Sequence, residues 1–318
     1  MISLIVVDYK SIEKTCCFLE EAAKRLGCGN GLHYLIVDND PDSAAASFLK
    51  GKYPVIRETV FTDVPVSFYQ AGYGEICYLF AGKNLGYAKG NNLGALAADQ
   101  FYQDEYYLIC NNDLRFESNW NPAEVIRVFR EQPKIAVIGP KIIGLDRKEQ
   151  NPYRKRSPYY WLFVYPWSRF WPIKSRGDYC RMAASGECYR VMGCMMFLRA
   201  DSFRACGRFD EHTFLFSEEM ILSEKMQTHE YTCYYDNRFC AVHEHAKTIR
   251  STTKAVQVEK WFFDSMFYYC RKYRKVPAVV MVPAWINRGL NLAAVAVKEK
   301  AKQLIGFQKS REHTEKKP

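Results

Sequence analysis

The fold class is indicated first by a strand-like run and the polar turn after it, Tyr106-Tyr107-Leu108-Ile109-Cys110-Asn111-Asn112-Asp113. Its first five residues are apolar or aromatic, as in a strand buried on both faces of a sheet. Three polar residues then stop the strand and leave a carboxylate, Asp113, at its carboxyl end. Short apolar runs at residues 2–7 and 33–37 end in the same way, at Asp8 and Asp38. The repeated pattern predicts parallel strands whose carboxyl ends meet at one edge of a sheet.

Helical patterns lie between these runs. Residues 14–25 and 92–101 are predicted to be helices, and after a less regular stretch residues 76–80 form another apolar run. Further along the chain, a helix is predicted at 122–132 and strands at 135–139 and 231–242. Alternating strands and helices of these lengths predict an α/β fold with a mostly parallel central sheet and helices on both faces.

Three carboxylates at one edge of a sheet need an explanation. Asp8, Asp38 or Asp113 alone would be an ordinary turn former or a solvated loop residue. Together, like charges in one cleft repel each other unless something positive compensates them. A divalent cation that bridges a diphosphate would do so, and oxygen ligands suit Mg²⁺ or Mn²⁺.

A glycine-containing loop precedes the 92–101 helix. Gly86 and Gly90 in residues 84–94 permit close backbone approaches that a Cβ would forbid. Asn92 is predicted to be the N-cap of the helix, whose free N–H groups would favour an anionic ligand. The glycine spacing differs from the dinucleotide fingerprint, and as a bare glycine loop the signal is weak.

In context, this loop resembles a motif of the family 2 glycosyltransferases. Asn84-Leu85-Gly86-Tyr87-Ala88-Lys89-Gly90-Asn91-Asn92 is followed, some twenty residues later, by a hydrophobic strand and Asn111-Asn112-Asp113. The likeness is closest to the rhamnosyltransferase-like branch, which acts in bacterial polysaccharide and capsule biosynthesis. Val37-Asp38-Asn39 looks like the strand-end motif for the nucleoside of the donor. Asn111-Asn112-Asp113 stands where the family has its Asp-x-Asp-type motif, whose last Asp holds the metal and the donor diphosphate.

The second half of the chain is similar to the same family. Gly207-Arg208-Phe209-Asp210-Glu211 and then Phe216-Ser217-Glu218-Glu219 resemble the segment Gly-x-Phe-Asp-Glu…Glu-Asp, and His243 falls where the family has a histidine. The resemblance spans residues 1–250 and implies a GT-A fold, with a nucleotide-sugar half at 1–115 and an acceptor half at 116–250. The donor-binding residues that it implies are Asp8, Tyr9, Asp38, Asn39, Asn84, Gly86, Tyr87, Gly90, Asn91, Asn92 and Asn112.

The resemblance also implies a reaction, an inverting single displacement. An acceptor hydroxyl would attack the anomeric carbon while the nucleoside diphosphate of a UDP- or dTDP-sugar leaves. Glu219 aligns with the catalytic base, with Glu218 beside it. Asp113 and His243 would bind Mn²⁺ or Mg²⁺, and the acceptor would be a glycan or a lipid-linked glycan.

The chain departs from the family at several positions. Asp8-Tyr9-Lys10 replaces the usual Thr-Tyr-Asn, and Glu218-Glu219 replaces Glu-Asp. Ile221 and Lys225 stand where an acidic residue and an Arg are usual. These changes indicate a divergent branch with its own donor or acceptor, and they keep open a catalytically inactive scaffold or partner subunit. A nucleotidyltransferase is the other alternative, although Asp8-Tyr9-Lys10-Ser11 is not the basic glycine loop that such enzymes carry after the first strand.

The composition suggests a compartment. The apolar run at 2–7 is short and ends at Asp8, so no secretory leader is predicted. The 12 cysteines are scattered without a Cys-x-x-Cys pair, which favours free thiols in a reducing cytoplasm over disulfides or zinc. Residues 147–171 combine Arg154-Lys155-Arg156 with many aromatic side chains. This segment is predicted to be a loop or flap, either packed locally or serving as an acceptor platform.

The C-terminal part, residues 251–318, is predicted to be a helical and basic extension. Residues 276–297 are long enough to span a bilayer, but Pro277, Pro283 and polar residues interrupt them. Along this helix one stripe is apolar, formed by Ile286, Leu290, Ala293 and Val297. A neighbouring face has Asn287, Asn291, Lys298 and Lys302.

This amphipathic spacing with lysine flanks favours a helix lying on an anionic membrane over a spanning helix or one packed on the protein's own core. The net charge of +10 is then explained without nucleic acid. The expected location is the cytoplasmic face of the cell membrane. The tail at 308–318 is predicted to be disordered.

Overall fold

The structure is a computed structural model that describes residues 1–27, 31–117, 119–168, 170, 180–244 and 253–314. The chain forms two compact units. Unit 1 comprises Met1–Lys155 and Arg176–His245, and unit 2 comprises Arg156–Ser175 and Ala246–Pro318. The aromatic segment that follows Lys155, which the sequence placed in the acceptor half, therefore clusters with the C-terminal helices.

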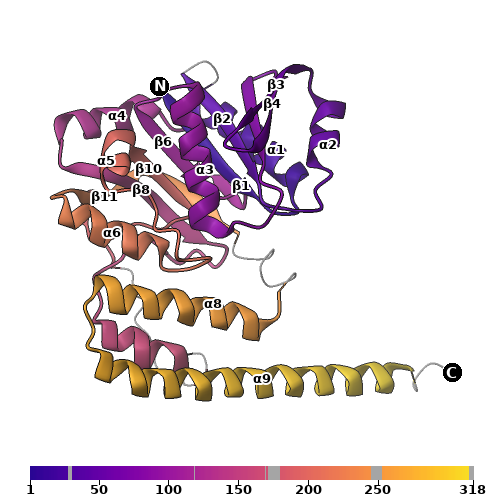
Figure 1. The fold of residues 1–318 in the computed structure, drawn as a ribbon, viewed down its shortest axis with the longest axis vertical. Coiled ribbons are helices and arrows are strands. Elements are labelled where there is room, and N and C mark those ends of the chain that lie inside the picture. The colour runs from indigo at the N-terminus through magenta and orange to yellow at the C-terminus, as the bar shows by residue number, and fades with distance from the viewer. Residues whose placement is uncertain (28–30, 118, 169, 171–179, 245–252, 315–318) are drawn as a thin grey trace. The chain divides into compact units, whose positions relative to one another are not determined.

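Unit 1 is built on one mixed sheet with the strand order β3-β4-β5-β2-β1-β6-β10-β8-β11-β7, and β9 pairs with β11 (Figure 1). The four neighbours β5, β2, β1 and β6 run parallel, whereas β10 is antiparallel to both β6 and β8. The strands are β1 Ile2–Asp8, β2 Leu32–Asp38, β3 Val55–Phe61, β4 Val64–Ala71, β5 Gly74–Phe80, β6 Tyr106–Cys110, β7 Leu114–Phe116, β8 Ile135–Gly144, β9 Gly186–Cys188, β10 Met195–Arg199 and β11 Thr232–His243.

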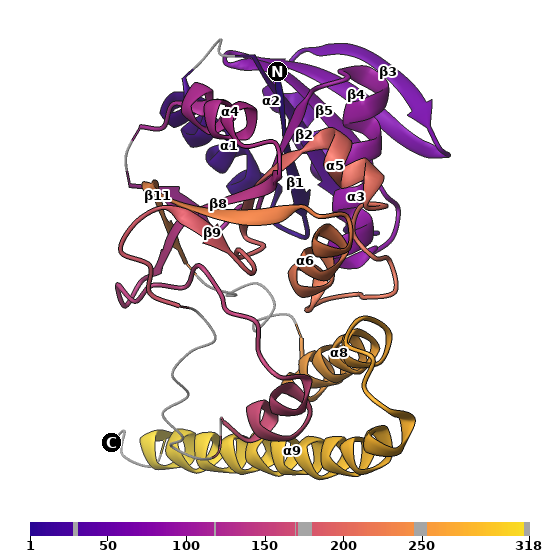
Figure 2. The same ribbon diagram turned by 90° about the vertical axis from the view of Figure 1, so that its left-hand side faces the viewer.

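Helices cover both faces of this sheet, as the two groups in Figure 2 show. One face packs against α1, α2 and α4 through side chains such as Phe18, Leu49 and Phe129. The opposite face packs against α3, α5 and α6 through side chains such as Ala95 and Phe203. The helices of unit 1 are α1 Ile12–Leu26, α2 Ala45–Lys52, α3 Gly86–Phe101, α4 Pro122–Glu131, α5 Ala200–Ala205 and α6 Glu218–Thr228.

The predicted parallel centre of the sheet is confirmed. In the register of β1 and β2, Asp8 pairs with Asp38, so their carboxyl ends do meet at one edge. The predicted start of the helix at residue 92 is wrong, because α3 begins at Gly86. Asn84 Oδ1 accepts a hydrogen bond from the Gly86 N–H at 3.0 Å, which satisfies an N–H at the start of the helix, and Asn92 lies buried in the helix body.

Unit 2 consists of helices and helical turns. They are η1 Tyr160–Val164, η2 Tyr165–Trp167, α8 Ala255–Tyr268, η3 Tyr269–Tyr273 and α9 Ala278–Thr314. The aromatic segment predicted to be a loop or flap thus contains two short helical turns, and Trp161 and Leu162 are buried there. The Tyr165 ring lies 5.2 Å from that of Phe262, so this segment packs within unit 2.

Candidate active site

Hydrogen bonds of Asp8 and Asn112 join the end of β1 to the turn after β6. The Asp8 carboxylate accepts hydrogen bonds from the Ser11 backbone N–H, the Ser11 hydroxyl and the Thr15 hydroxyl, and it is only 1% exposed. Asn112 Nδ2 donates to Thr15 Oγ1 at 2.7 Å and to Ser11 Oγ at 2.9 Å. Burial raises the pKa of Asp8, and the bonds from Thr15 and Ser11 oppose this shift. Tyr9, the next residue, is half-buried.

Both oxygens of the Asp38 carboxylate likewise accept hydrogen bonds from other residues of unit 1. Its Oδ2 accepts from the Tyr78 hydroxyl at 2.6 Å, and its Oδ1 accepts from the Asp40 N–H at 2.9 Å. We expected a cation to compensate Asp8 and Asp38 as well as Asp113. Hydrogen bonds from neighbouring residues stabilise the first two, whereas Asp113 has His243 beside it at this edge.

The start of α3 is fitted tightly against the loop that precedes α6. Gly86 has φ +74°, and a Cβ there would lie 2.2 Å from the Phe214 carbonyl oxygen, so only glycine fits. The Tyr87 N–H donates to that same oxygen at 2.9 Å. Asn39 Nδ2 donates to the Gly86 carbonyl oxygen at 3.0 Å, which ties the end of β2 to this turn.

The remaining residues of this motif have structural partners. A Cβ at Gly90 would meet Val7 and Asn39 at 3.0–3.2 Å. Asn91 Nδ2 donates to the Tyr87 carbonyl oxygen. Asn92 faces the other half of unit 1, where its side chain exchanges hydrogen bonds with the backbone of Phe209. Asn92, predicted to bind the donor, is thus bonded to the segment 207–211 and fixes its position.

Asp113 and His243 are brought together by strands β7 and β11. The two strands pair antiparallel, with His243 opposite Leu114, and the Glu244 N–H donates to the Asp113 carbonyl oxygen. His243 Nε2 lies 3.3 Å from Asp113 Oδ1, within ion-pair distance, and no other described residue bonds this buried oxygen. Burial raises the pKa of Asp113, but His243 and Lys14 more than offset it, so the net shift is downward and the carboxylate is ionised at neutral pH.

Glu218 and Glu219 open α6 but have different surroundings. Glu219 is partly exposed, and its Oε1 accepts from the Gly193 N–H at 3.0 Å. Glu218 is 4% exposed, and its Oε1 has no hydrogen-bond partner in the described chain. The two residues before α6, Phe216 and Ser217, have φ of +74° and +68°, a strained conformation for side chains with a Cβ.

The turn Gly193-Cys194 is hydrogen-bonded to α3, to α6 and to the segment after β6. The Gly193 carbonyl oxygen accepts from the Tyr87 hydroxyl at 2.5 Å, while its N–H holds Glu219. The Cys194 carbonyl oxygen accepts from the Asn111 N–H at 2.9 Å. Burial raises the pKa of the Cys194 thiol, and the charges of Asp113 and Glu219 add to the shift. The turn therefore links the start of α3 and Glu219 to the segment that ends in Asp113.

Comparisons with known proteins bear on the fold. No protein-family model and no curated protein matches this chain. A solved structure of GalNAc-T7 with UDP, GalNAc and Mn²⁺ matches with a TM-score of 0.54 and 10% identity over 87% of this chain. The chain has a GT-A-like fold. It spans 51% of that structure's length, and at this identity the likeness concerns the fold and not the rhamnosyltransferase-like branch.

One pair of side chains at this site, Asp113 and His243, has the chemistry to bind a divalent cation. In the described residues no cluster of three or more His, Cys, Asp and Glu side chains could enclose a metal. Asp113 and His243, however, offer a carboxylate oxygen and an imidazole nitrogen side by side. Such a pair suits Mn²⁺ or Mg²⁺ when the phosphate oxygens of a ligand supply further positions.

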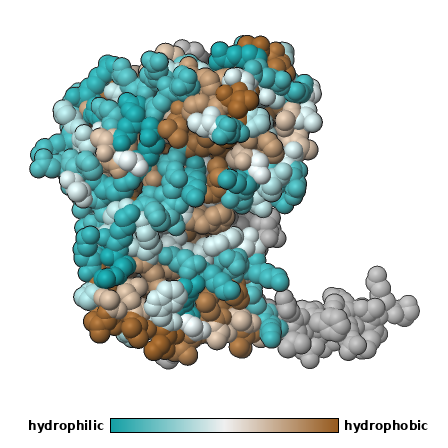
Figure 3. All heavy atoms as spheres, in the orientation of Figure 1, coloured by the Kyte–Doolittle hydropathy of each residue, from teal (hydrophilic) through white to brown (hydrophobic). Residues whose placement is uncertain are grey.

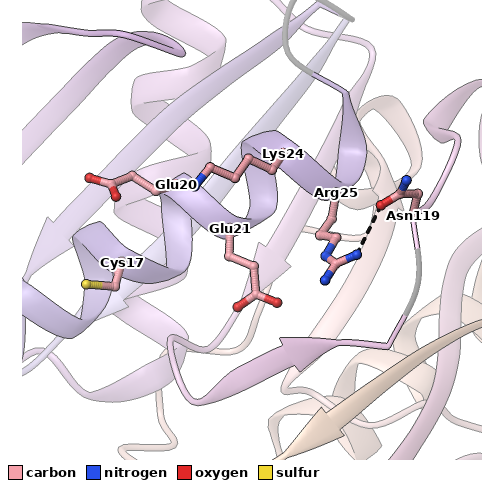
Figure 4. A pocket seen from close by; sticks show the side chains of 6 residues that line it. All are labelled: Cys17, Glu20, Glu21, Lys24, Arg25 and Asn119. Carbon is pink, nitrogen blue, oxygen red and sulfur yellow. Dashed lines mark hydrogen bonds between the residues drawn. The ribbon is translucent and has the colours of Figure 1, made fainter.

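A surface pocket lies elsewhere in unit 1 (Figure 4). Its residues come from α1 and the segment before α4, and one hydrogen bond, from Arg25 to Asn119, crosses it. None of the predicted site residues lines it. The lining residues are Cys17, Glu20, Glu21, Lys24, Arg25 and Asn119.

Sequence reasoning missed Gly193, Tyr78 and Lys225 as contributors to this site. Lys225 Nζ donates to the carbonyl oxygens of Gly207 and Arg208, so the residue that replaces the family's Arg holds the segment 207–211. Ile221, at the usual acidic position, is fully buried in the core. Gly193 lies in an apolar stretch with no motif around it, and no local signal could have revealed its role.

The buried Glu218 predicts a pH-dependent stability. Burial raises the pKa of Glu218 well above its usual range, and the charge of Glu219 adds to this. The folded state therefore keeps this proton at pH values where the unfolded chain has released it, so stability falls as pH rises above about 4.3 until the folded pKa is reached. Glu218→Gln should remove this slope, about 1.4 kcal/mol per pH unit. Thermal melting from about pH 5 to about 8 measures it.

The control for this prediction is Glu187→Gln, which changes an exposed carboxylate on β9. It should leave the pH slope of the wild-type protein intact. Equal slopes for Glu218→Gln and the wild-type protein would contradict the prediction.

Proposed function

We propose that this protein is an inverting, metal-dependent glycosyltransferase. It transfers a sugar from a UDP- or dTDP-sugar to a hydroxyl of a growing surface glycan, which we propose is lipid-linked, as in the rhamnosyltransferase-like branch of bacterial polysaccharide synthesis. The observation that carries the proposal is the turn Gly193-Cys194, whose Gly193 N–H bonds Glu219 and whose Cys194 carbonyl oxygen bonds the N–H of Asn111, two residues before Asp113. This connection supports a site in which Glu219 is the base and Asp113 and His243 are the metal-binding pair, in a GT-A-like fold.

The proposed roles combine the family resemblance with the contacts at the site. Glu219 takes the proton of the acceptor hydroxyl while the oxygen–anomeric carbon bond forms and the bond to the diphosphate breaks. Its hydrogen bond from Gly193 fixes the position of the carboxylate. Asp113 and His243 would hold Mn²⁺ or Mg²⁺, which would neutralise charge on the leaving diphosphate. The start of α3 and Asn39 shape the donor side of the site.

Glu218 has a different role in this proposal. Its raised pKa keeps the carboxyl neutral, and it has almost no exposed surface, so it cannot receive a proton from a substrate. Its protonation instead avoids a second negative charge beside Glu219. Asp8 and Asn112 fix the turn that presents Asp113.

The direct test is turnover with a panel of UDP- and dTDP-sugars, Mn²⁺ or Mg²⁺, and a bacterial lipid extract as acceptor source. We expect release of nucleoside diphosphate with one donor, dependent on the metal, and a product of inverted anomeric configuration by NMR. Donor binding without turnover would favour the inactive scaffold. Release of pyrophosphate from a nucleoside triphosphate and a sugar 1-phosphate would favour the nucleotidyltransferase.

A further inference from the structure

Helix α9 of unit 2 exposes its apolar side. Its outward residues follow helical spacing, so they form one stripe over about 27 Å of helix. Figure 3 shows hydrophobic side chains gathered over the first half of this helix. The most exposed members of the stripe are Val279 (76%), Val282 (62%), Ile286 (63%), Leu290 (59%) and Val297 (67%).

Two asparagines of α9, Asn287 and Asn291, lie off the stripe and are bonded within unit 2. Asn287 accepts from Trp167 Nε1 at 2.7 Å and donates to the Leu162 carbonyl oxygen at 2.8 Å. Asn291 is fully buried and donates to the Pro166 carbonyl oxygen at 2.9 Å. These bonds fix the rotation of the helix about its axis, so the apolar stripe faces outward as a consequence of packing.

The same contacts argue against a spanning helix. Ala278–Ala301 is long and apolar enough to cross a membrane by length and composition alone, with 17% of its apolar window buried. Spanning would break the bonds of Asn287 and Asn291 and the 2.7 Å ion pair between Arg288 and Asp264. It would place amide and guanidinium groups in hydrocarbon, which costs several kcal/mol. A helix lying in the interface keeps all of them.

Charge indicates what covers the stripe. Unit 2 has 19 Lys and Arg against 5 Asp and Glu, a formal charge of +14, whereas unit 1 has 26 against 30, a charge of −4. Exposed lysines flank the stripe, with Lys272 and Lys275 before α9 and Lys298 and Lys300 near its described end. A second copy of unit 2 would bring like charges together, whereas an anionic bilayer would attract them. The half-exposed Trp285 is also typical of an interfacial helix.

We propose that the apolar face of α9, with its lysine flanks, is a docking surface for an anionic lipid bilayer, on which the helix lies parallel to the membrane plane. The surface uses no residue of the candidate active site. It therefore does not rest on the proposed transferase activity, although it would bring the protein to the lipid surface where a lipid-linked acceptor resides.

The experiment is flotation of the full chain with phosphatidylcholine vesicles, with and without phosphatidylglycerol. We expect binding to the anionic vesicles. The double variant Ile286→Asp and Leu290→Asp should lower the partition coefficient at least about 100-fold, because it removes two outward apolar side chains and adds two negative charges. Lys298→Gln with Lys300→Gln should lower binding to the anionic vesicles by about tenfold and leave binding to neutral ones unchanged.

The matched control is Val60→Asp, an exposed apolar residue on β3 of unit 1, and it should bind like the wild-type protein. Unchanged melting and circular dichroism would show that the α9 variants fold. Nucleoside diphosphate release from a soluble donor should stay unchanged in them, so loss of binding is separable from loss of activity. Vesicle binding that survives the double aspartate variant overturns the proposal. So does a dimer that the same variant dissociates, in the absence of vesicle binding.

Discussion

Glu219→Gln should lower kcat of glycosyl transfer by about 1,000-fold, within the range that a general base contributes, with little change in the KM of the nucleotide sugar. The substituted amide can still accept the Gly193 N–H bond through its oxygen, so the site keeps its shape. It cannot take the proton of the acceptor hydroxyl. Steady-state kinetics at saturating metal, with the donor that the panel identifies, measure both constants.

Two further variants make this test specific. Glu218→Gln should keep kcat within about tenfold at neutral pH, because the pKa of Glu218 is already raised and a neutral amide mimics its protonated form. Gly193→Ala should lower kcat by about 10- to 100-fold, since its Cβ would lie 2.3 Å from Glu219 Oε1 and must displace the base. Equal losses in Glu218→Gln and Glu219→Gln would contradict the assignment of Glu219 as the base.

The parallel half of the fold could be predicted because its signals are local. Each strand there is a short apolar run stopped by polar residues, and in parallel strands those stops must gather at one edge. The placement of Asp8, Asp38 and Asp113 followed from this rule. The antiparallel half is different, because β10 pairs with strands from distant parts of the chain and its sequence resembles any buried segment.

What the sequence could not provide is the bonding at the site. The carboxylates of Asp8 and Asp38 look alike in the sequence to that of Asp113, yet hydroxyl and backbone donors satisfy the first two. Similarly, Gly193 contacts Glu219 across 26 positions of the chain, a separation that no periodicity reports. The start of α3 was misplaced because glycine and asparagine weaken a helical pattern, whereas the contact of Gly86 with Phe214 requires that turn.

On the diphosphate side of the site, Asp113→Asn should weaken Mn²⁺-dependent binding of UDP or dTDP by at least about 100-fold, since loss of a residue that only supports a metal ligand already costs about 10- to 100-fold. The substitution keeps the size of the side chain and removes the charge that attracts the cation. The lowered pKa of Asp113 means that the wild-type carboxylate is available at neutral pH. Titration calorimetry with each nucleotide, with and without Mn²⁺, separates the metal-dependent part of the affinity from the rest.

A second variant tests the other member of the Asp113–His243 pair, which β7 and β11 bring together. His243→Ala should weaken the same binding by about tenfold, because it removes the neighbouring nitrogen at 3.3 Å but leaves the charge. Asp146→Ala, which changes an exposed carboxylate paired with Lys148, is the matched control and should bind as the wild-type protein does. Because Asp113 Oδ1 lies beside His243 and no other described residue bonds it, we expect a metal that binds here to use this oxygen. Full Mn²⁺-dependent affinity in Asp113→Asn would therefore place the cation elsewhere and remove the basis for the proposed role of the β7–β11 pair.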